Sequence, residues 1–172
     1  MSTIVPLLIA VVVGLGSSAQ IALIGGMARS RSAPEATFTS MMATLAGIAL
    51  VLAIRGLRGD APQYFAPLDR GTAFFVVAAV ASVLLVLSMK GVHPGYAVTG
   101  VFATAFLLGT AALVPRLGVA LFFAATTAGS LIGALIFDQI GAFGAQATPL
   151  SPLRVLGVVA VLAGVTLVRI AR

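Results

Sequence analysis

The sequence has no cysteine and no tryptophan, a single histidine and only four acidic residues among its 172. The absence of cysteine excludes disulfides, thiolate nucleophiles and cysteine-ligated metal sites. With ten Lys and Arg, only 8% of the residues are charged, against about 25% in soluble globular domains. So few charged side chains cannot cover the surface of a water-soluble protein of this size. An ordinary soluble enzyme and a disordered chain are therefore excluded.

Apolar residues are abundant instead, since 60% of the residues are hydrophobic and the mean hydropathy is +1.19. The formal net charge of +6 comes mainly from arginines that flank the apolar stretches. This pattern is typical of membrane proteins and not of a nucleic-acid-binding surface. The composition predicts an integral membrane protein that contacts the lipid bilayer and no nucleic acid.

Six apolar stretches approach or reach the roughly 20 residues that a helix needs to cross a bilayer. No Asp, Glu, Lys or Arg interrupts their centres. We predict transmembrane spans at Ile4–Met27, Ala36–Ile54, Gly71–Met89, Tyr96–Val114, Leu117–Phe137 and Leu153–Ile170. The connections leave no room for a soluble domain, so residues 1–172 are expected to form one all-α, polytopic transmembrane domain. Five spans are the alternative, if Gly71–Met89 does not cross.

Local motifs predict several helix boundaries. Ser32 and Glu35, with a proline between them, form a capping box at the start of the second span. Ser151 precedes a proline in the same way before the last span, and Gly141 suits a C-terminal cap after the fifth. Pro115-Arg116 predicts a tight turn between the fourth and fifth spans.

Polar side chains inside the spans are candidates for a solute pathway, because unpaired polar groups are costly in hydrocarbon. Ser17 and Gln20 share a face of the first span, and Thr127 and Ser130 share a face of the fifth. The hydroxyls can instead bond a backbone carbonyl one turn back, which is the structural alternative. The Gln20 amide has donors and an acceptor that one such bond cannot satisfy. We predict that all four residues line a solute-binding cavity.

Few residues could support catalysis. No carboxylate lies in mid-span, and Asp138, at the end of the fifth span, is expected to be solvated or to cap the helix. His93 stands alone in a connection, so we expect no metal site, and no catalytic or phosphate-binding motif is present. The sequence predicts neither an enzyme nor a cofactor. Recognition by hydrogen bonds and apolar contacts favours a neutral or weakly charged solute.

A series of different short motifs lies between the end of the fourth span and the last span. They are Val114–Gly118 (VPRLG), Ala128-Gly129, Phe137–Gly141 (FDQIG), Pro149–Arg154 (PLSPLR), Leu156-Gly157 and Leu162–Val165 (LAGV). In these motifs the sequence resembles the short YdcZ-like branch of the drug/metabolite transporter superfamily. The region Gly14–Gly47 is more loosely similar through Gln20, but Ile24 stands where the family pattern has asparagine.

The resemblance implies transport of small solutes across the cell inner membrane. Short members of this branch usually have five spans, so Gly71–Met89 is expected to be additional. Such members are also expected to pair in order to form a complete transporter. We therefore expect a small secondary transporter or exporter of a metabolite or drug-like solute, working by alternating access. A membrane scaffold or assembly subunit is the alternative.

The loop charges bear on how two copies would pair. With six spans, one side of the membrane receives Arg55, Arg58, Arg70, Arg116, Arg169 and Arg172, and the other receives Arg29, Arg31, Lys90 and Arg154. This bias is weak by the positive-inside rule, so both insertion directions are open to the chain. We expect a homodimer that can be antiparallel. A fixed orientation, set by the loop with Arg55, Arg58 and Arg70, is the alternative.

Overall fold

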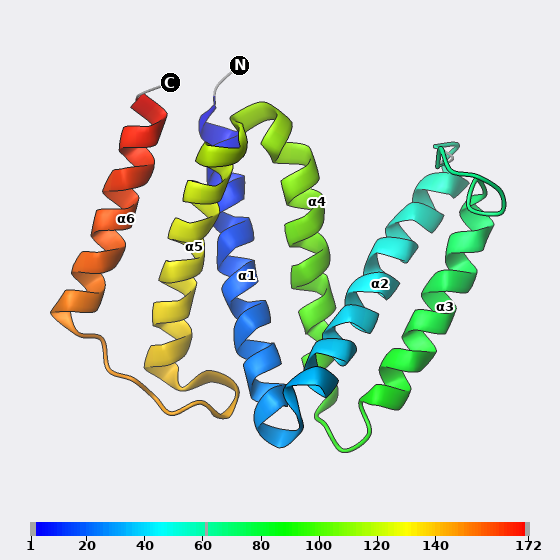
Figure 1. Ribbon diagram of the computed structural model, residues 1–172, viewed down its shortest axis with the longest axis horizontal. Coiled ribbons are helices and arrows are strands. Elements are labelled where there is room, and N and C mark those ends of the chain that lie inside the picture. The colour runs from blue at the N-terminus through cyan, green and yellow to red at the C-terminus, as the bar shows by residue number, and fades with distance from the viewer. Residues whose placement is uncertain (1–2, 61, 171–172) are drawn as a thin grey trace. The chain divides into compact units, whose positions relative to one another are not determined.

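The computed structural model describes residues 3–60 and 62–170, and every regular element among them is a helix (Figure 1). The α-helices are α1 (Ile4–Ser30), α2 (Ala33–Leu57), α3 (Gly71–Ser88), α4 (Thr99–Leu117), α5 (Val119–Ile140) and α6 (Pro152–Ile170). Two short 3-10 helices, η1 (Pro94–Val98) and η2 (Ala142–Gly144), lie in connections. The predicted all-α fold is confirmed.

Five helical segments are long and apolar enough to cross a membrane: α1, α2, α3, Pro94–Leu117 and α5. The sixth helix, α6, has a shorter apolar stretch, Pro152–Leu167, within the described residues. The helix α3 is 18 residues long and belongs to the five. The sequence left open whether Gly71–Met89 crosses the membrane. The helix α3, which covers this segment, has the length and composition of a span.

The predicted helix caps are confirmed. The Ser32 hydroxyl accepts from the Glu35 backbone N–H at 3.4 Å, and the Glu35 carboxylate accepts from the Ser32 backbone N–H at 3.0 Å. The Ser151 hydroxyl accepts from the Arg154 N–H at 3.3 Å at the start of α6. Gly141 ends α5 in the left-handed conformation, with φ 59°. These boundaries follow from residues within one turn of each other.

The turn predicted at Pro115-Arg116 is wrong, because α4 continues through Pro115 to Leu117. The chain breaks instead at Gly118, whose φ of 77° lies where a side chain would be strained. The Gly118 N–H still donates to the Val114 carbonyl at 2.8 Å and completes the last turn of α4. A proline in the last turn removes one backbone donor, and the helix ends before further bonds are affected.

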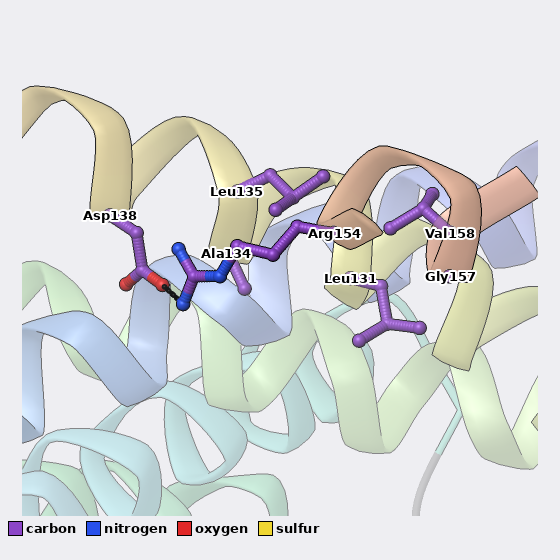
Figure 2. Close-up of a pocket in the computed structure, with 7 residues that line it drawn as sticks. All are labelled: Leu131, Ala134, Leu135, Asp138, Arg154, Gly157 and Val158. Carbon is purple, nitrogen blue, oxygen red and sulfur yellow. Dashed lines mark hydrogen bonds and ion pairs between the residues drawn. The ribbon is translucent and has the colours of Figure 1, made fainter. Parts of the chain in front are cut away.

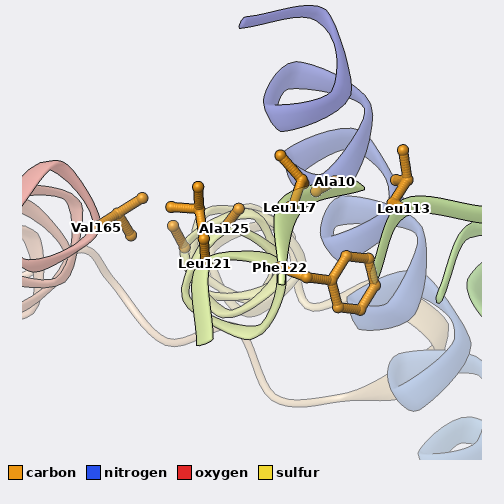
Figure 3. Packing of buried hydrophobic residues seen from close by; sticks show 8 residues of the cluster. Ala10, Leu113, Leu117, Leu121, Phe122, Ala125 and Val165 are labelled. Atoms are coloured by element: carbon orange, nitrogen blue, oxygen red, sulfur yellow. The ribbon is translucent and has the colours of Figure 1, made fainter. Parts of the chain in front are cut away.

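The contacts divide the chain into two compact units. Unit 1 contains the described residues up to Gly26 and from Ala105 onward, and unit 2 contains Met27–Thr104. In unit 1, α5 lies in the middle of an apolar cluster drawn from four helices (Figure 3). The cluster consists of Ala10, Leu113, Leu117, Leu121, Phe122, Ala125, Ala128 and Val165.

Two helices of unit 1, α1 and α5, approach each other at backbone distance. A Cβ added at Gly14 would fall on the carbonyl oxygen of Thr126, and one added at Gly129 would fall on the carbonyl oxygen of Val11. The contact is therefore reciprocal, with a glycine on each helix facing the backbone of the other. Glycines allow this approach in membrane helices, where close packing and not the hydrophobic effect holds helices together.

In unit 2, α2 and α3 lie side by side in opposite directions (Figure 1). Their core consists of Ala49, Ala53, Phe74 and Ala78. Hydroxyls tie α2 to the first residues of α4, because Ser40 Oγ lies 3.2 Å from Thr99 Oγ1 and Thr104 Oγ1 donates to the Thr44 carbonyl. These polar residues are bonded within the unit and serve helix packing.

The end of α3 is held by Arg31, whose guanidinium donates to the backbone carbonyl of Ser88. The last carbonyls of a helix lack partners within it, and a cation there also complements the helix dipole. We expect Arg31→Met to lower the unfolding free energy of unit 2 by about 1.5–2 kcal/mol. Denaturant unfolding of the protein in detergent, followed by circular dichroism, measures this loss.

The matched control is Arg58→Met. The side chain of Arg58 is exposed and has no hydrogen bond or ion pair within residues 3–60 and 62–170. This control should change stability by less than about 0.5 kcal/mol. Equal losses in the two variants would mean that the Arg31 contact does not hold α3.

Candidate functional site

A groove of about 310 Å³ lies between α1 and α5, both within unit 1. We name it the α1–α5 groove. Its lining consists of Ser18, Ile21, Ala22, Ser130, Leu131, Ala134, Phe137 and Asp138. The α5 residues recur at intervals of three and four, so they lie on one face of that helix. The groove is apolar except for two hydroxyls and one carboxylate.

A second groove, of about 250 Å³, lies between α5 and α6 and is named the α5–α6 groove (Figure 2). Its lining consists of Leu131, Ala134, Leu135, Asp138, Arg154, Gly157 and Val158. Leu131, Ala134 and Asp138 line both grooves. The groove on the α1 side and the groove on the α6 side therefore share these three residues of α5.

Asp138 and Arg154 form an ion pair across the end of the α5–α6 groove, with 3.1 Å between Oδ2 and Nη2 (Figure 2). Both side chains are partly exposed, 46% for Asp138 and 40% for Arg154. The connection between the two helices folds back on the same point, since the Thr148 N–H donates to the Asp138 carbonyl at 2.8 Å. Asp138 is partly solvated, as expected, but its carboxylate also forms an ion pair and lines both grooves.

Two of the three hydroxyls of the predicted site, those of Ser17 and Ser130, bond backbone carbonyls one turn back. Ser17 donates to Gly14 at 2.7 Å and Ser130 donates to Thr127 at 3.0 Å. Ser18, in the α1–α5 groove, donates to Leu15 at 2.7 Å. These serine hydroxyls therefore make the local backbone bonds that were the structural alternative to a role in the solute pathway. Each oxygen keeps lone pairs that can accept a further bond.

Gln20 and Thr127 differ from these serines. Both side chains are half-buried, and neither has a hydrogen bond to any other residue that the structure describes. No fully buried side-chain nitrogen or oxygen lacks a partner in the same part of the chain, so their polar atoms are accessible. An accessible amide and hydroxyl on apolar helices are free to bind a solute, water or another chain.

The structure brings only one of the four predicted residues into a groove. Ser130 lines the α1–α5 groove, and Thr127 lies one turn earlier on the same face of α5, outside the lining. Ser17 and Gln20 lie outside the linings of both grooves. The neighbouring Ser18, turned by about 100° around α1, takes the place expected for them.

Sequence reasoning assigned no site role to Ser18, Asp138 and Arg154. The spacing of Ser130, Ala134 and Asp138 could have placed Asp138 on the groove face, because residues four apart lie one above the other on a helix. No comparable pattern connects Arg154 to Asp138, since they are on different helices. The ion pair depends on how the connection between α5 and α6 folds back.

A comparison with protein families supports the resemblance noted in the sequence. The model of a family described as "Putative inner membrane exporter, YdcZ" matches residues 67–167, more than half of the chain. A search of curated proteins and a search of solved structures each found no match. The matched region includes α3, so the span expected to be additional lies within the family's pattern, while α1 and α2 lie outside it.

The family and the fold agree on the class of the protein. An inner membrane exporter family points to a transporter and not to an enzyme. The apolar helices have the length and composition that a multi-pass membrane protein needs. The chain is a multi-pass inner membrane protein of the transporter class, and it belongs to the YdcZ family.

Proposed function

We propose that this protein exports a small metabolite or drug-like solute as a secondary transporter that works by alternating access. The observation that carries the proposal is the α1–α5 groove, where Ser18, Ser130 and Asp138 supply polar atoms between apolar helices. Its volume of about 310 Å³ is at the lower end of the range found for small-molecule sites. The family description supports export as the direction of transport.

The arrangement of α5 is suited to alternating access. The same three residues, Leu131, Ala134 and Asp138, line cavities on two sides of this helix. A small rotation of α5, or a shift of α6, would enlarge one groove at the expense of the other. Shifts of packed helices of this kind are the movements by which alternating access opens and closes a solute site.

We also propose that the functional unit is a homodimer, with an antiparallel pair as an arrangement that the loop charges allow. Six Lys and Arg on one side against four on the other leave the orientation weakly determined. An inverted second copy would supply the related half that larger transporters contain within one chain. Light scattering in detergent should therefore give the mass of a dimer. A monodisperse monomer that retains full transport in liposomes would contradict this proposal.

Gln20, Ser17, Thr127 and Ser130 are proposed to line the solute pathway. Gln20 and Thr127 support this role because their polar atoms are accessible and have no partner among the described residues. Ser130 supports it by its place in the α1–α5 groove. Gln20 lies outside that groove, so we propose that it contacts the solute in another state of the transport cycle.

We expect Gln20→Leu to weaken solute-dependent stabilisation and to leave the stability of the unliganded protein nearly unchanged. Leucine has a similar size but offers no hydrogen bond. A screen of metabolites by thermal unfolding of the purified protein measures both quantities, because specific binding raises apparent stability by mass action. The control is Thr44→Val, which removes a hydroxyl bonded locally to Ser40 in unit 2.

Two results would count against this assignment. If Gln20→Leu unfolds the protein, the amide serves helix packing. If the variant binds and transports like the parent, Gln20 lies outside the pathway. A screen in which no solute stabilises the parent protein would favour a scaffold over a transporter.

A further inference from the structure

We propose that the α1–α5 groove binds organic cations, with the ammonium group held by Asp138 and with Arg154 as the cation that competes with it for the carboxylate. This inference rests on the proposed function, because it takes the groove as the solute site. It goes beyond that function by naming the charge and the hydrogen-bonding character of the solute. It also replaces the neutral solute that the lack of mid-span charge suggested.

The polar atoms of the groove are all acceptors. The Ser18 and Ser130 hydroxyl protons are already donated to the carbonyls of Leu15 and Thr127, so their oxygens present only lone pairs. Asp138 contributes a carboxylate, which also only accepts. The other lining residues, Ile21, Ala22, Leu131, Ala134 and Phe137, have no polar side-chain atom. A solute that offers N–H donors fits this lining, and an anionic solute does not.

Charge points to the same class of solute. A cation that enters an apolar groove needs a counter-charge, because the loss of its hydration is otherwise not compensated. Asp138 is the acidic residue of the lining, and no lysine or arginine lines the α1–α5 groove. The aromatic ring of Phe137 lies in the same lining and can add a cation–π contact.

Arg154 reaches Asp138 from the α6 side, through the α5–α6 groove (Figure 2). It bonds one carboxylate oxygen, Oδ2. The other oxygen, Oδ1, has no hydrogen bond among the described residues. The pair therefore neutralises Asp138 when the groove is empty and leaves one oxygen for a ligand. An ammonium group at that oxygen weakens the hold of Arg154, so the two cations compete.

The length of the groove limits the body of the solute. Ser130 and Asp138 are eight residues apart on α5, which corresponds to about 12 Å along a helix. A compact organic amine can place its nitrogen at Asp138 and its apolar body beside Leu131 and Ala134. The substrate class that follows is a small amphipathic amine that binds as its protonated ammonium form.

The experiment uses the full chain in detergent and a panel of matched compounds. Primary and secondary aryl-alkyl amines are each paired with the neutral alcohol and the carboxylate of a matching skeleton, such as 2-phenylethylamine with 2-phenylethanol and 3-phenylpropionate. Isothermal titration calorimetry gives the affinities, and titrations into protein-free micelles correct for partitioning. We expect amines to bind and the neutral and anionic partners to bind at least about tenfold more weakly.

Two single variants should shift amine affinity in opposite directions. Asp138→Asn removes the counter-charge and should weaken amine binding about tenfold or more. Arg154→Gln removes the competing cation and should strengthen amine binding several-fold. A purely structural ion pair would instead give two variants with lowered melting temperatures and unchanged amine affinity. That result would overturn the proposal.

A double variant guards against a failure to fold. Asp138→Asn combined with Arg154→Gln leaves no unpaired charge, so it should fold and still not bind amines. Amine binding in a folded double variant would overturn the proposal. So would a parent protein that binds no amine of the panel.

The two proposals can fail separately. Ala134→Phe fills the groove without changing its charge. If neutral or anionic compounds bind to the parent and lose their binding in this variant, the groove is a solute site and only the cation class is wrong. If a metabolite found in the thermal-unfolding screen binds to Ala134→Phe as it binds to the parent, the assignment of the groove as the solute site fails as well.

Discussion

Gly129→Val should prevent α1 and α5 from packing and should lower the unfolding free energy of unit 1 by about 3 kcal/mol, the upper end of the usual cost of overpacking. The first carbon of a side chain at this position would fall on the carbonyl oxygen of Val11 and also press on the backbone nitrogen of Leu15. Both obstructing atoms belong to a helix backbone, so no change of side-chain rotamer can relieve the clash. The two helices would have to separate.

The loss would spread through the unit, because α5 supplies the centre of its apolar cluster. Separation of α1 from α5 would also widen the α1–α5 groove and displace Ser18 from Ser130. Denaturant unfolding of the purified protein measures the change in stability. The yield of folded protein after membrane extraction gives a second reading if the variant is too unstable to purify.

Gly164→Val is the matched control on α6. A Cβ at Gly164 meets no atom within 4 Å. Valine is also a better helix former than glycine, by a few tenths of a kcal/mol. This variant should therefore be as stable as the parent or slightly more stable. Similar losses at Gly129 and Gly164 would show that the effect comes from valine in a membrane helix and not from the contact between α1 and α5.

The helices and their caps could be predicted from the sequence because their determinants are local. Ser32 and Glu35 bond each other within one turn, and Gly141 ends α5 through its own backbone conformation. The turn at Pro115-Arg116 was misplaced for a related reason. Proline suggests a break, but one missing donor in a last turn is tolerated, and the residue that ends α4 is Gly118.

The site could be predicted only in part, because the face that a helix turns toward its neighbour is not a local property. Periodicity placed Ser17 and Gln20 on one face of α1, but Gly14 brings α5 against a different face and puts Ser18 in the groove. The sequence contained these glycines without showing which helix each one faces. Asp138 was identified as the end of a span, and its place between two grooves depends on the packing of three helices.

Ala134→Phe should abolish transport while leaving the protein folded. Ala134 lines both the α1–α5 groove and the α5–α6 groove, so a large side chain at this position occupies the space on whichever side it turns. The ring would enter a volume of about 310 Å³ or about 250 Å³ and would not enter a packed core. Apolar surface gained in the groove should keep the melting temperature close to that of the parent.

Ala112→Phe provides the control, because Ala112 is an exposed residue of α4 in the same unit and lines neither groove. Both variants add one aromatic ring to an apolar helix, so expression, insertion and hydrophobicity are matched. The transported compound is a solute found in the thermal-unfolding screen. Its efflux from cells or its uptake into inverted vesicles, normalised to the amount of folded protein, measures transport. If Ala134→Phe transports as well as Ala112→Phe, the solute does not pass along this face of α5. Loss of transport in the Ala134 variant alone, with both proteins folded, would place the solute pathway along the face of α5 that lines the two grooves.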